Sequence, residues 1–310
     1  MKAIKILTPG WFTTVQDQGR TSFQHMGVPV SGALDARAAA LANLLAGNPE
    51  TDAVLEITVM GPSFEVLQEM DMALTGANIE ITVNGEIRPT WETIRLSPGD
   101  KVILGGASGG CRGYLALGGG IQVPRLMGSA STYVGGKTGG FDGRPLKKDD
   151  VLESRDQAPL ERPRSLPQEM IPDLTAPKIL HAVPGPQDDY FEPDILFNTP
   201  YTVTENADRM GYRLSGKPLP IIEGKPASII SEPVVPGAIQ VPAEQQPIIL
   251  LGEQTVGGYA KIATVISTDL HVVAQALPGD VFEFRKISPE QARERLGQWH
   301  ARLQELKAGF

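Results

Sequence analysis

The stretch SEPVVPGAIQVPAEQQPIILLGEQTVGGYAKIATVISTDL, residues 231–270, decides the fold of this chain. Its apolar runs are short and rich in β-branched residues, and proline or glycine interrupts each of them. Such runs predict consecutive strands joined by tight turns rather than a helix. Polar side chains lie beside the glycines, where a sharply bent backbone can present its N–H groups to a ligand. The stretch is therefore typical of the mouth of a β-barrel that binds a ligand.

The polar and glycine residues of this stretch are the first candidates for a site. Lys261, Tyr259 and Gln240 are the expected catalytic residues, because a lysine enclosed among apolar strands loses its proton more easily and can act near neutral pH. An edge lysine that discourages sheet aggregation explains Lys261 equally well. The residues expected to bind substrate here are Ser231, Gln254, Thr255, Gly257 and Gly258.

A second dense stretch covers residues 13–48, where polar residues stand among glycines and a helix follows. Apolar residues at helical spacing predict a helix over 35–46, with Gly47 as its end. Asp35 then lies at the positive end of the helix dipole, where an ordinary cap and a substrate contact are equally good interpretations. Arg20 is a further candidate for binding substrate, although an ion pair with Asp17 that shapes the loop also explains it.

Three other arginines stand beside glycines in strand-like sequence. Arg112 precedes an apolar run, while Arg209 and Arg213 flank Gly211 and Tyr212 in DRMGYRL. A guanidinium group held near a turn can bind a carboxylate through two hydrogen bonds. We therefore expect these arginines to contact substrate, with a surface position or a pair with Asp208 as the alternative.

Composition limits the class of protein. The chain has 310 residues, a net charge of −8, 34 glycines, 26 prolines and one cysteine. Abundant glycine and proline with short strand-like runs favour a mainly β fold. The negative charge argues against nucleic-acid or membrane partners, and the lone Cys111 and the absence of a signal peptide predict a cytoplasmic location. The four histidines are scattered, so no metal site is expected.

The order of predicted elements indicates two β-barrel domains. The expected bounds are 1–154 for the first barrel, 155–178 for a proline-rich linker, 179–286 for the second barrel and 287–310 for a C-terminal helix capped by Ser288. Asn84-Gly85 predicts a hairpin turn. The sequence Pro-Gly-Asp precedes a strand at 98–100 and again at 278–280, which is a weak indication that the barrels are similar.

Three short matches to catalytic motifs lack the required surroundings. Residues 106–110 fit G-x-S-x-G, but a strand rather than a helix follows. Residues 135–138 imitate the end of a phosphate-binding loop without its first glycine or its helix. Residues 118–120 lack the spacing of a dinucleotide-binding fingerprint. Turns explain the second and third matches, and Ser108 of the first is not expected to act as a nucleophile.

Eight motifs occur in the order that is typical of one family. They are TVQDQGR (14–20), GVPVSGALD (27–35), LANLLAGN (41–48), YLALGGG (114–120), GSAST (128–132), DRMGYRL (208–214), SEPVVPGAIQVP (231–242) and EQTVGGYAKIATVIS (253–267). Together they resemble the family of the 5-oxoprolinase C subunit (PxpC), also described as KipA-like or allophanate hydrolase subunit 2. Its relatives form half of the carboxyltransferase domain of urea carboxylase, and the resemblance implies two cyclophilin-like β-barrels.

The resemblance also implies a function within a complex. The C subunit would work with an A subunit and with a KipI-like B subunit, related to allophanate hydrolase subunit 1, to open the lactam of 5-oxoproline to glutamate. The complex would use ATP, and the chain alone would be inactive. One alternative is carboxyl transfer to a urea-like or amide substrate from carboxybiotin, with the biotin carried by another protein. Another is a KipA-like regulator that binds a kinase inhibitor.

Overall fold

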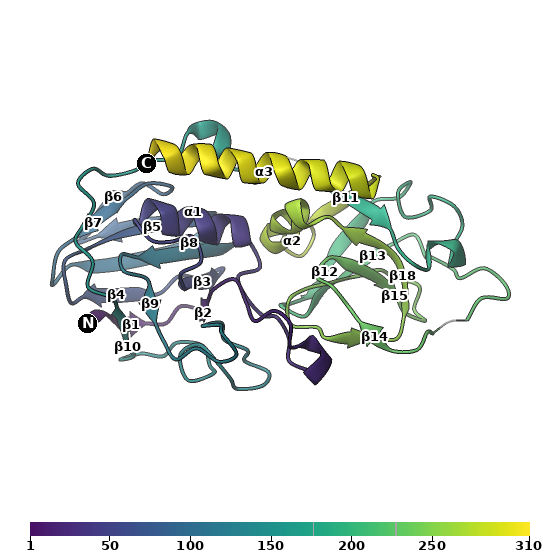
Figure 1. Ribbon diagram of the computed structural model, residues 1–310, viewed down its shortest axis with the longest axis horizontal. Coiled ribbons are helices and arrows are strands. Elements are labelled where there is room, and N and C mark those ends of the chain that lie inside the picture. The colour runs from purple at the N-terminus through teal and green to yellow at the C-terminus, as the bar shows by residue number, and fades with distance from the viewer. Residues whose placement is uncertain (176, 227) are drawn as a thin grey trace. The chain divides into compact units, whose positions relative to one another are not determined.

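The computed structural model describes residues 1–175, 177–226 and 228–310 (Figure 1). The chain divides into two compact units. Unit 1 comprises Met1–Arg20 and Ser31–Thr175, and unit 2 comprises Thr21–Val30 and Ala176–Phe310. The fold class expected from the sequence is confirmed, because each unit is built mainly from β-strands that curl into a barrel-like sheet.

Unit 1 is a ten-stranded sheet with one α-helix among its described residues. Its elements are β1 (Lys2–Thr8), β2 (Phe12–Gln16), α1 (Ala36–Leu45), β3 (Val54–Thr58), β4 (Ser63–Val66), β5 (Met70–Val83), β6 (Glu86–Arg88), β7 (Ile94–Leu96), β8 (Lys101–Leu117), β9 (Ile121–Gln122), β10 (Val151–Ser154) and the 3₁₀ turn η2 (Gln168–Met170). The strand order is β2-β3-β8-β4-β1-β10-β9, with β5 paired to β6, β7 and β8.

The strands β5 and β8 form the longest antiparallel pair in unit 1. The runs DMALTG and IEITVNG, and likewise KVILGG and GYLALGG, predict two short strands in each of these regions. Instead, each region is one continuous strand, and the register of the pair shifts several times. These shifts bend a long strand without ending it, which is how one strand can serve two sides of a curved sheet. The core that the sheet encloses includes Ile4, Leu55 and Leu115.

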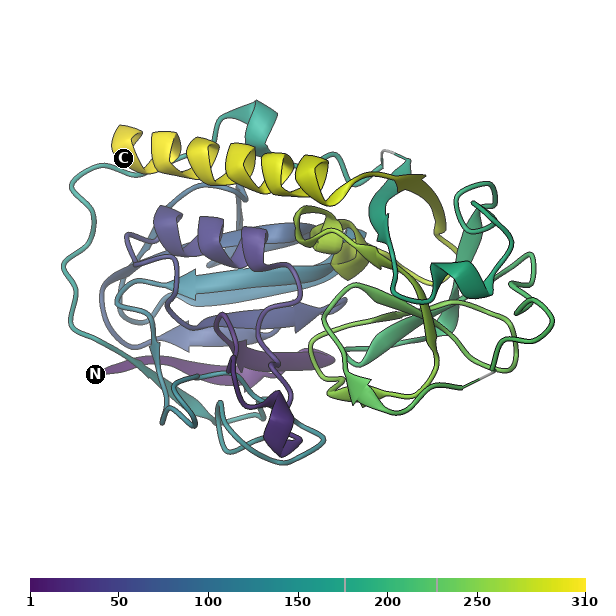
Figure 2. The same cartoon turned by 45° about the vertical axis from the view of Figure 1, so that its right-hand side comes forward.

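Helix α1 packs against β5 and β8 (Figures 1 and 2). It confirms the helix expected over 35–46. The side chain of Asp35 accepts a hydrogen bond from the N–H of Ala38 at 2.9 Å, so Asp35 is the N-cap. Nearly every residue of the helix is buried, which explains why its sequence is so rich in alanine.

The segment expected as a linker over 155–178 packs on unit 1 as far as Thr175. Arg155 pairs with Asp52, the N–H of Leu160 donates to Asp71 at 2.6 Å, and that of Leu166 donates to Trp91 at 3.1 Å. The segment is rich in prolines and charges and has no periodic apolar pattern, so its sequence indicated a linker. Its hydrogen bonds to unit 1 nevertheless hold it in place, and such bonds produce no periodic pattern in the sequence.

Unit 2 contains a closed barrel in the order β11-β18-β15-β16-β13-β12-β19 and a separate ribbon, β14–β17. Its elements are η1 (Gln24–Met26), β11 (Lys178–Pro184), η3 (Asp188–Tyr190), β12 (Tyr201–Ala207), β13 (Gly211–Gly216), β14 (Glu232–Pro233), β15 (Ala238–Val241), β16 (Ile248–Leu250), β17 (Val256–Gly257), β18 (Ala260–Val265), η4 (Ser267–Asp269), α2 (Leu270–Gln275), β19 (Val281–Lys286) and α3 (Pro289–Gly309). Strand β11 pairs with β18 on one side and with β19 on the other, which closes the barrel.

Two expectations for unit 2 need correction. Only strands were expected over 231–270, yet η4 and the start of α2 lie at its end. A six-residue helix is too short to show a period, and burial of Val273 and Ala274 holds it in place. The short run ASIIS at 227–231 also predicts a strand. Residue 227 lies outside the described residues, and 228–231 have no strand.

The predicted turns and caps are confirmed. Asn84 and Gly85 both have positive φ, 53° and 86°, and join β5 to β6 as a hairpin. The capping box at Ser288 is present, with Gln291 donating to the Ser288 side chain and accepting from its N–H at 2.9 Å. Helix α3 confirms the expected C-terminal helix. Within residues 1–175, 177–226 and 228–310, no helix combines the length and apolar character needed to cross a membrane.

The two Pro-Gly-Asp turns are alike in detail. Gly99 and Gly279 have φ of 91° and 92°. In each turn the aspartate side chain accepts a 2.7 Å hydrogen bond from the N–H three residues before it. Each glycine also donates to the valine of a neighbouring strand, Val66 or Val203, and that valine donates back to the aspartate carbonyl. The repeated sequence therefore marks the same local structure in both units.

Candidate functional site

A register shift between β15 and β18 positions the candidate site of unit 2. Ile239 pairs with Ala263 and Gln240 pairs with Lys261, so Ile262 is left out of the pairing. Such a β-bulge re-aims the side chains around it. Gln240 lines one cavity of the unit, and Ile262 lines another.

The side chain of Gln240 is buried, with 3% of its surface exposed. Its amide nitrogen Nε2 has no hydrogen-bond partner among the described residues. Gly257 of the β14–β17 ribbon lies directly against this amide, since a Cβ added to Gly257 would stand 2.0 Å from Nε2. A glycine is therefore required at 257 for Gln240 to take this position.

Lys261 forms an ion pair with Glu232 of β14. The lysine side chain is 9% exposed and the glutamate 47%. The backbone N–H of Lys261 donates to the side chain of Gln187 at 3.0 Å. Because the ammonium group already donates to a carboxylate, Lys261 is placed to tie the ribbon to β18, and its geometry does not favour a role as a base.

The larger of the two cavities described here has a volume of about 440 Å³. It is lined by Glu205, Asn206, Ala207, Asp208, Met210, Gly211, Arg213, Gln240, Ile248, Leu250, Gln254 and Tyr259. The structure thus brings four expected residues together: Gln240, Arg213, Gln254 and Tyr259. The sequence gave no indication that Glu205 and Asn206 of β12 line this cavity. They are exposed polar residues at the end of a strand, and their sequence does not differ from that of an ordinary loop.

The remaining expected residues of the 231–270 stretch support the ribbon. The amide of Gln254 donates to the carbonyl of Val256 at 2.7 Å, and the carbonyl of Thr255 accepts from Val234 at 3.1 Å. Ser231 lies against Gly258, where an added Cβ would stand 3.0 Å from its hydroxyl oxygen. These contacts fix the segment that carries Tyr259, whose side chain remains 44% exposed.

The two arginines of DRMGYRL have different surroundings. Arg209 is buried, and its Nε lies 2.6 Å from Glu253. The alternative pair with Asp208 does not explain this residue, since Asp208 accepts hydrogen bonds from the N–H groups of Met210 and Gly211 at 2.8 and 3.1 Å. Arg213 is exposed, lines the cavity, and its guanidinium makes no ion pair or hydrogen bond within the described ranges.

Arg20, Asp35 and Arg112 belong to unit 1, and none of them lines the unit 2 cavity. Asp35 caps α1, and its N–H donates to the Tyr114 hydroxyl at 2.8 Å. That hydroxyl donates to Glu56 at 2.9 Å, and Arg112 Nε lies 3.8 Å from the same carboxylate. Burial, followed by the nearby carboxylates of Glu56 and Asp35, raises the pKa of Tyr114 well above its usual value, so Tyr114 stays protonated.

Asp17 is the centre of a second buried network in unit 1. Its carboxylate accepts hydrogen bonds from the hydroxyls of Ser129 and Ser131, both at 2.6 Å, and from the N–H groups of Ala130 and Gly19 at 2.7 and 2.8 Å. Burial raises the pKa of Asp17, but these hydrogen bonds outweigh it, and the pKa is lowered overall.

Arg20 joins this network through Ser131. Its guanidinium donates to the hydroxyl of Ser31 at 3.2 Å and to the carbonyl of Ser131. Asp17 and Arg20 thus both bind the 128–132 loop, whose sequence gave one of the eight family motifs. The network therefore holds this loop in place and does not form an open binding site.

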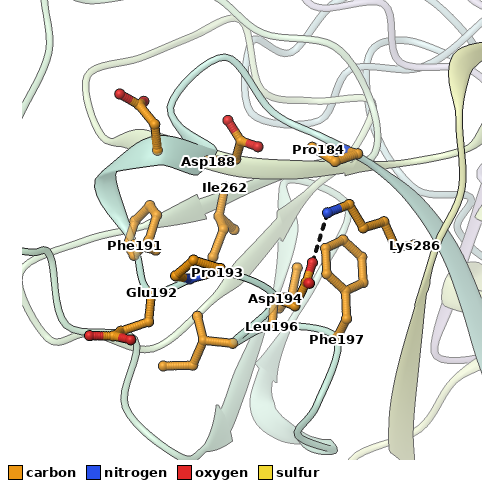
Figure 3. A pocket seen from close by; sticks show the side chains of 12 residues that line it. Pro184, Asp188, Phe191, Glu192, Pro193, Asp194, Leu196, Phe197, Ile262 and Lys286 are labelled. Carbon is orange, nitrogen blue, oxygen red and sulfur yellow. Dashed lines mark hydrogen bonds and ion pairs between the residues drawn. The ribbon is translucent and has the colours of Figure 1, made fainter.

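The smaller cavity, of about 160 Å³, lies on another part of unit 2 (Figure 3). Phe191, Leu196 and Ile262 give it an apolar floor, and Lys286 pairs with Asp194 at 2.7 Å on its rim. None of the residues expected to form a site lines it. No group of three or more histidine, cysteine or acidic residues suited to a metal ion occurs in the part of the chain that the structure describes.

Comparison with known proteins assigns the chain to a family. The profile of the carboxyltransferase domain, subdomain A and B, matches residues 26–286. A relative from Escherichia coli strain K12, named as the C subunit of 5-oxoprolinase, is 35% identical over 295 residues, which is 93% of each chain. Urea amidolyase from Saccharomyces cerevisiae is 33% identical over 311 residues, which is 94% of this chain and 17% of that protein.

A solved structure agrees with these relationships. The crystal structure of Kluyveromyces lactis urea amidolyase matches with a TM-score of 0.88 at 33% identity, over 94% of this chain and 19% of that one. This chain thus corresponds to nearly all of a 5-oxoprolinase C subunit and to a fraction of a urea amidolyase. It belongs to the carboxyltransferase domain family, subdomains A and B.

Proposed function

We propose that this chain is the C subunit of an ATP-dependent 5-oxoprolinase, which hydrolyses the lactam of 5-oxoproline to glutamate. The observation that carries the proposal is the 35% identity to a 5-oxoprolinase C subunit, which extends over 93% of both chains. The similarity to urea amidolyase covers 17% of that protein, so most of that protein lies outside the matched region.

The reaction adds water across the lactam C–N bond. A hydroxyl adds to the carbonyl carbon, negative charge builds on the carbonyl oxygen, and a proton passes to the nitrogen as it leaves. Gln240 is the donor we assign to that oxygen, because its buried amide has no partner among the described residues. The N–H groups of Gly257 and Gly258 are further candidate donors beside it. Tyr259, exposed on the cavity rim, is our candidate for transferring the proton.

The A and B subunits complete the enzyme in this proposal. The relatives that cover this chain almost fully are themselves named as one part of a larger enzyme, which supports a complex. ATP would be bound and used by the complex, and the chain alone would not hydrolyse 5-oxoproline.

Reconstitution tests the proposal. The chain is purified with its candidate A and B subunits, and glutamate formed from 5-oxoproline is measured with and without ATP. We expect ATP-dependent glutamate formation from the full set, and loss of it when any one of the three proteins is omitted. A full set that forms no glutamate but carboxylates an amide in a biotin-dependent manner would overturn the proposal.

Carboxyl transfer from carboxybiotin is the second candidate function. The TM-score of 0.88 to a urea amidolyase favours it. The Gln240 amide would then hold the ureido oxygen of biotin or urea, and Tyr259 would transfer the proton. Incorporation of labelled bicarbonate into urea, dependent on a biotin carrier protein, distinguishes this reaction from lactam hydrolysis.

A further inference from the structure

The smaller cavity of unit 2 has an apolar floor and a limited size. Its volume is about 160 Å³, and the floor consists of the buried side chains of Phe191, Leu196 and Ile262. An apolar cavity of about 150 Å³ in another protein holds one benzene molecule. The cavity of unit 2 therefore has room for one aromatic ring or one branched alkyl group, whereas sites for drug-sized ligands span about 300 to 1,000 Å³.

The barrel and the loop that follows β11 hold this floor in position. Ile262 belongs to β18, and its carbonyl accepts a hydrogen bond from the N–H of Gly185 at 2.8 Å. Phe191 pairs with Ile221 as an isolated β-bridge, and its N–H donates to the carbonyl of Asp188 at 3.2 Å. The cavity is thus formed before a ligand arrives, which lowers the entropy cost of binding.

Acidic residues surround the apolar floor. Four of them line the cavity: Asp188, Asp189, Glu192 and Asp194. Lys225 pairs with Asp189, and Lys286 pairs with Asp194 at 2.7 Å. Asp188 and Glu192 form no ion pair within the described ranges 1–175, 177–226 and 228–310. The rim therefore carries an excess of negative charge, which attracts a cation and repels an anion.

The two lysines beside the cavity show how its surroundings hold an ammonium group. The Nζ of Lys286 lies 5.9 Å from the ring centre of Phe197, and that of Lys225 lies 4.9 Å from the ring centre of Tyr190. Each ammonium group thus lies near a carboxylate and over the face of an aromatic ring, and both attract a cation. The same two kinds of group are present for a cationic ligand.

One carboxylate of the rim is available to such a ligand. Figure 3 shows the carboxylate of Glu192 pointing away from the other side chains that line the cavity, whereas that of Asp188 does not. We propose that the cavity binds a small amine, whose apolar body fills the floor and whose ammonium group pairs with Asp188. The site is independent of the proposed function, because no residue assigned to lactam opening lines this cavity.

Three probes that share one aromatic ring test the site by calorimetric titration of the full chain. Benzylamine carries an ammonium group at neutral pH, benzyl alcohol is neutral, and benzoate is an anion. We expect benzylamine to bind about fivefold more tightly than benzyl alcohol, and benzoate to bind most weakly. Added salt should weaken the binding of benzylamine and not that of benzyl alcohol. No binding of benzylamine, or equal binding of benzylamine and benzoate, would overturn the inference.

The NMR signal of the Ile262 side-chain methyl groups locates the ligand. Ile262 is the residue that the register shift between β15 and β18 leaves out of the pairing, and it forms part of the floor. Benzylamine should shift its methyl signals and leave those of Ile4 and Ile57, in the core of unit 1, unchanged. Shifts confined to unit 1 would place the ligand elsewhere and contradict the assignment.

A charge substitution identifies the contact with the ammonium group. Asp188→Asn should weaken benzylamine binding about fivefold and leave benzyl alcohol binding unchanged, because only the amine loses its partner. Glu244→Gln is the matched control, since it removes an exposed carboxylate of the same unit that does not line the cavity. Thermal unfolding checks that both variants are folded. Equal weakening by the two variants would show that the net charge of the unit attracts the amine, and would overturn the role of Asp188.

Discussion

Each unit of the molecule contains a buried glutamine on a β-strand, Gln16 in unit 1 and Gln240 in unit 2, and these two have opposite surroundings. In unit 1, the Nε2 of Gln16 donates to the hydroxyl of Thr14 at 3.0 Å and to the carbonyl of Thr132 at 3.1 Å. In unit 2, the Nε2 of Gln240 has no partner among the described residues. Gln16 leaves only its carbonyl oxygen Oε1 without a partner, and a carbonyl oxygen without a partner is tolerated better than an N–H group.

The difference separates a structural amide from a binding amide. Gln16 joins two segments that lie 116 residues apart in the sequence, within a region where Asp17 accepts four hydrogen bonds. The Nε2 of Gln240 links its strand to no other segment among the described residues, and Gln240 lines a cavity. A buried polar group whose donors are used contributes to stability, whereas one whose donors are unused is available for a ligand.

The largest effect that we expect is on the stability of unit 1. Asp17→Ala would leave the hydroxyls of Ser129 and Ser131 and two N–H groups without their acceptor, and should lower the free energy of unfolding by about 3 to 5 kcal/mol. Urea unfolding followed by fluorescence, with the buried Trp91 reporting on unit 1, measures the change. Asp156→Ala, which removes an exposed carboxylate in the same unit, should change stability by less than about 0.5 kcal/mol.

Paired substitutions of the two glutamines test the comparison directly. Gln16→Leu should destabilise unit 1 by about 1 to 3 kcal/mol, because its two acceptors lose their donor. Gln240→Leu should leave unit 2 as stable as before, or more stable by about 1 kcal/mol, since a buried amide without a partner is replaced by an apolar group. Hydrogen exchange of β2, β15 and β18 measures both. Equal destabilisation by the two variants would refute the distinction drawn here.

Gly257→Ala tests whether the position of Gln240 matters. The added methyl group would displace the Gln240 amide and should weaken 5-oxoproline binding to the isolated chain about tenfold, or about 1.4 kcal/mol, while the fold is retained. Gly297→Ala on α3 is the control, because its methyl group would meet no other atom within 4 Å. Equal loss of affinity in both variants would show that displacement of Gln240 is not the cause.

The smallest effect that we expect depends on pH. The pKa of Asp17 is lower in the folded chain than in the unfolded one, where a carboxyl has a pKa of about 3.9. Its contribution is therefore complete above the unfolded value and is lost as pH falls through the folded one. Unfolding of unit 1 measured from pH 6 to pH 3 should show this loss below about pH 4, and Asp17→Ala should reduce it. A variant with an unchanged slope would show that other carboxylates cause the loss.

Local signals predicted local structure well. The Asn84-Gly85 turn, the helix that Asp35 caps, the capping box at Ser288 and the strands of residues 231–270 all follow from short-range rules. The expected linker could not be distinguished from an ordered segment, because hydrogen bonds such as that from Leu160 to Asp71 depend on partners distant in the sequence. The helix α2 was missed because its six residues are too few to show a helical period.

Among the candidate site residues, the sequence identified chemistry but not position. It singled out Arg209 and Arg213 together, and only the tertiary structure distinguished them, because Glu253 lies 44 residues away from Arg209 and pairs with it. Likewise, the sequence around Lys261 suggested a base, and only the fold brings Glu232 beside it.

The sequence by itself determined that this chain is a mainly β member of the carboxyltransferase domain family, since turns, caps and ordered motifs depend on neighbouring residues. The tertiary structure decided which polar groups are paired. A hydrogen bond or an ion pair is set by distance in space, and the register shift beside Gln240 exists only once β15 and β18 lie side by side.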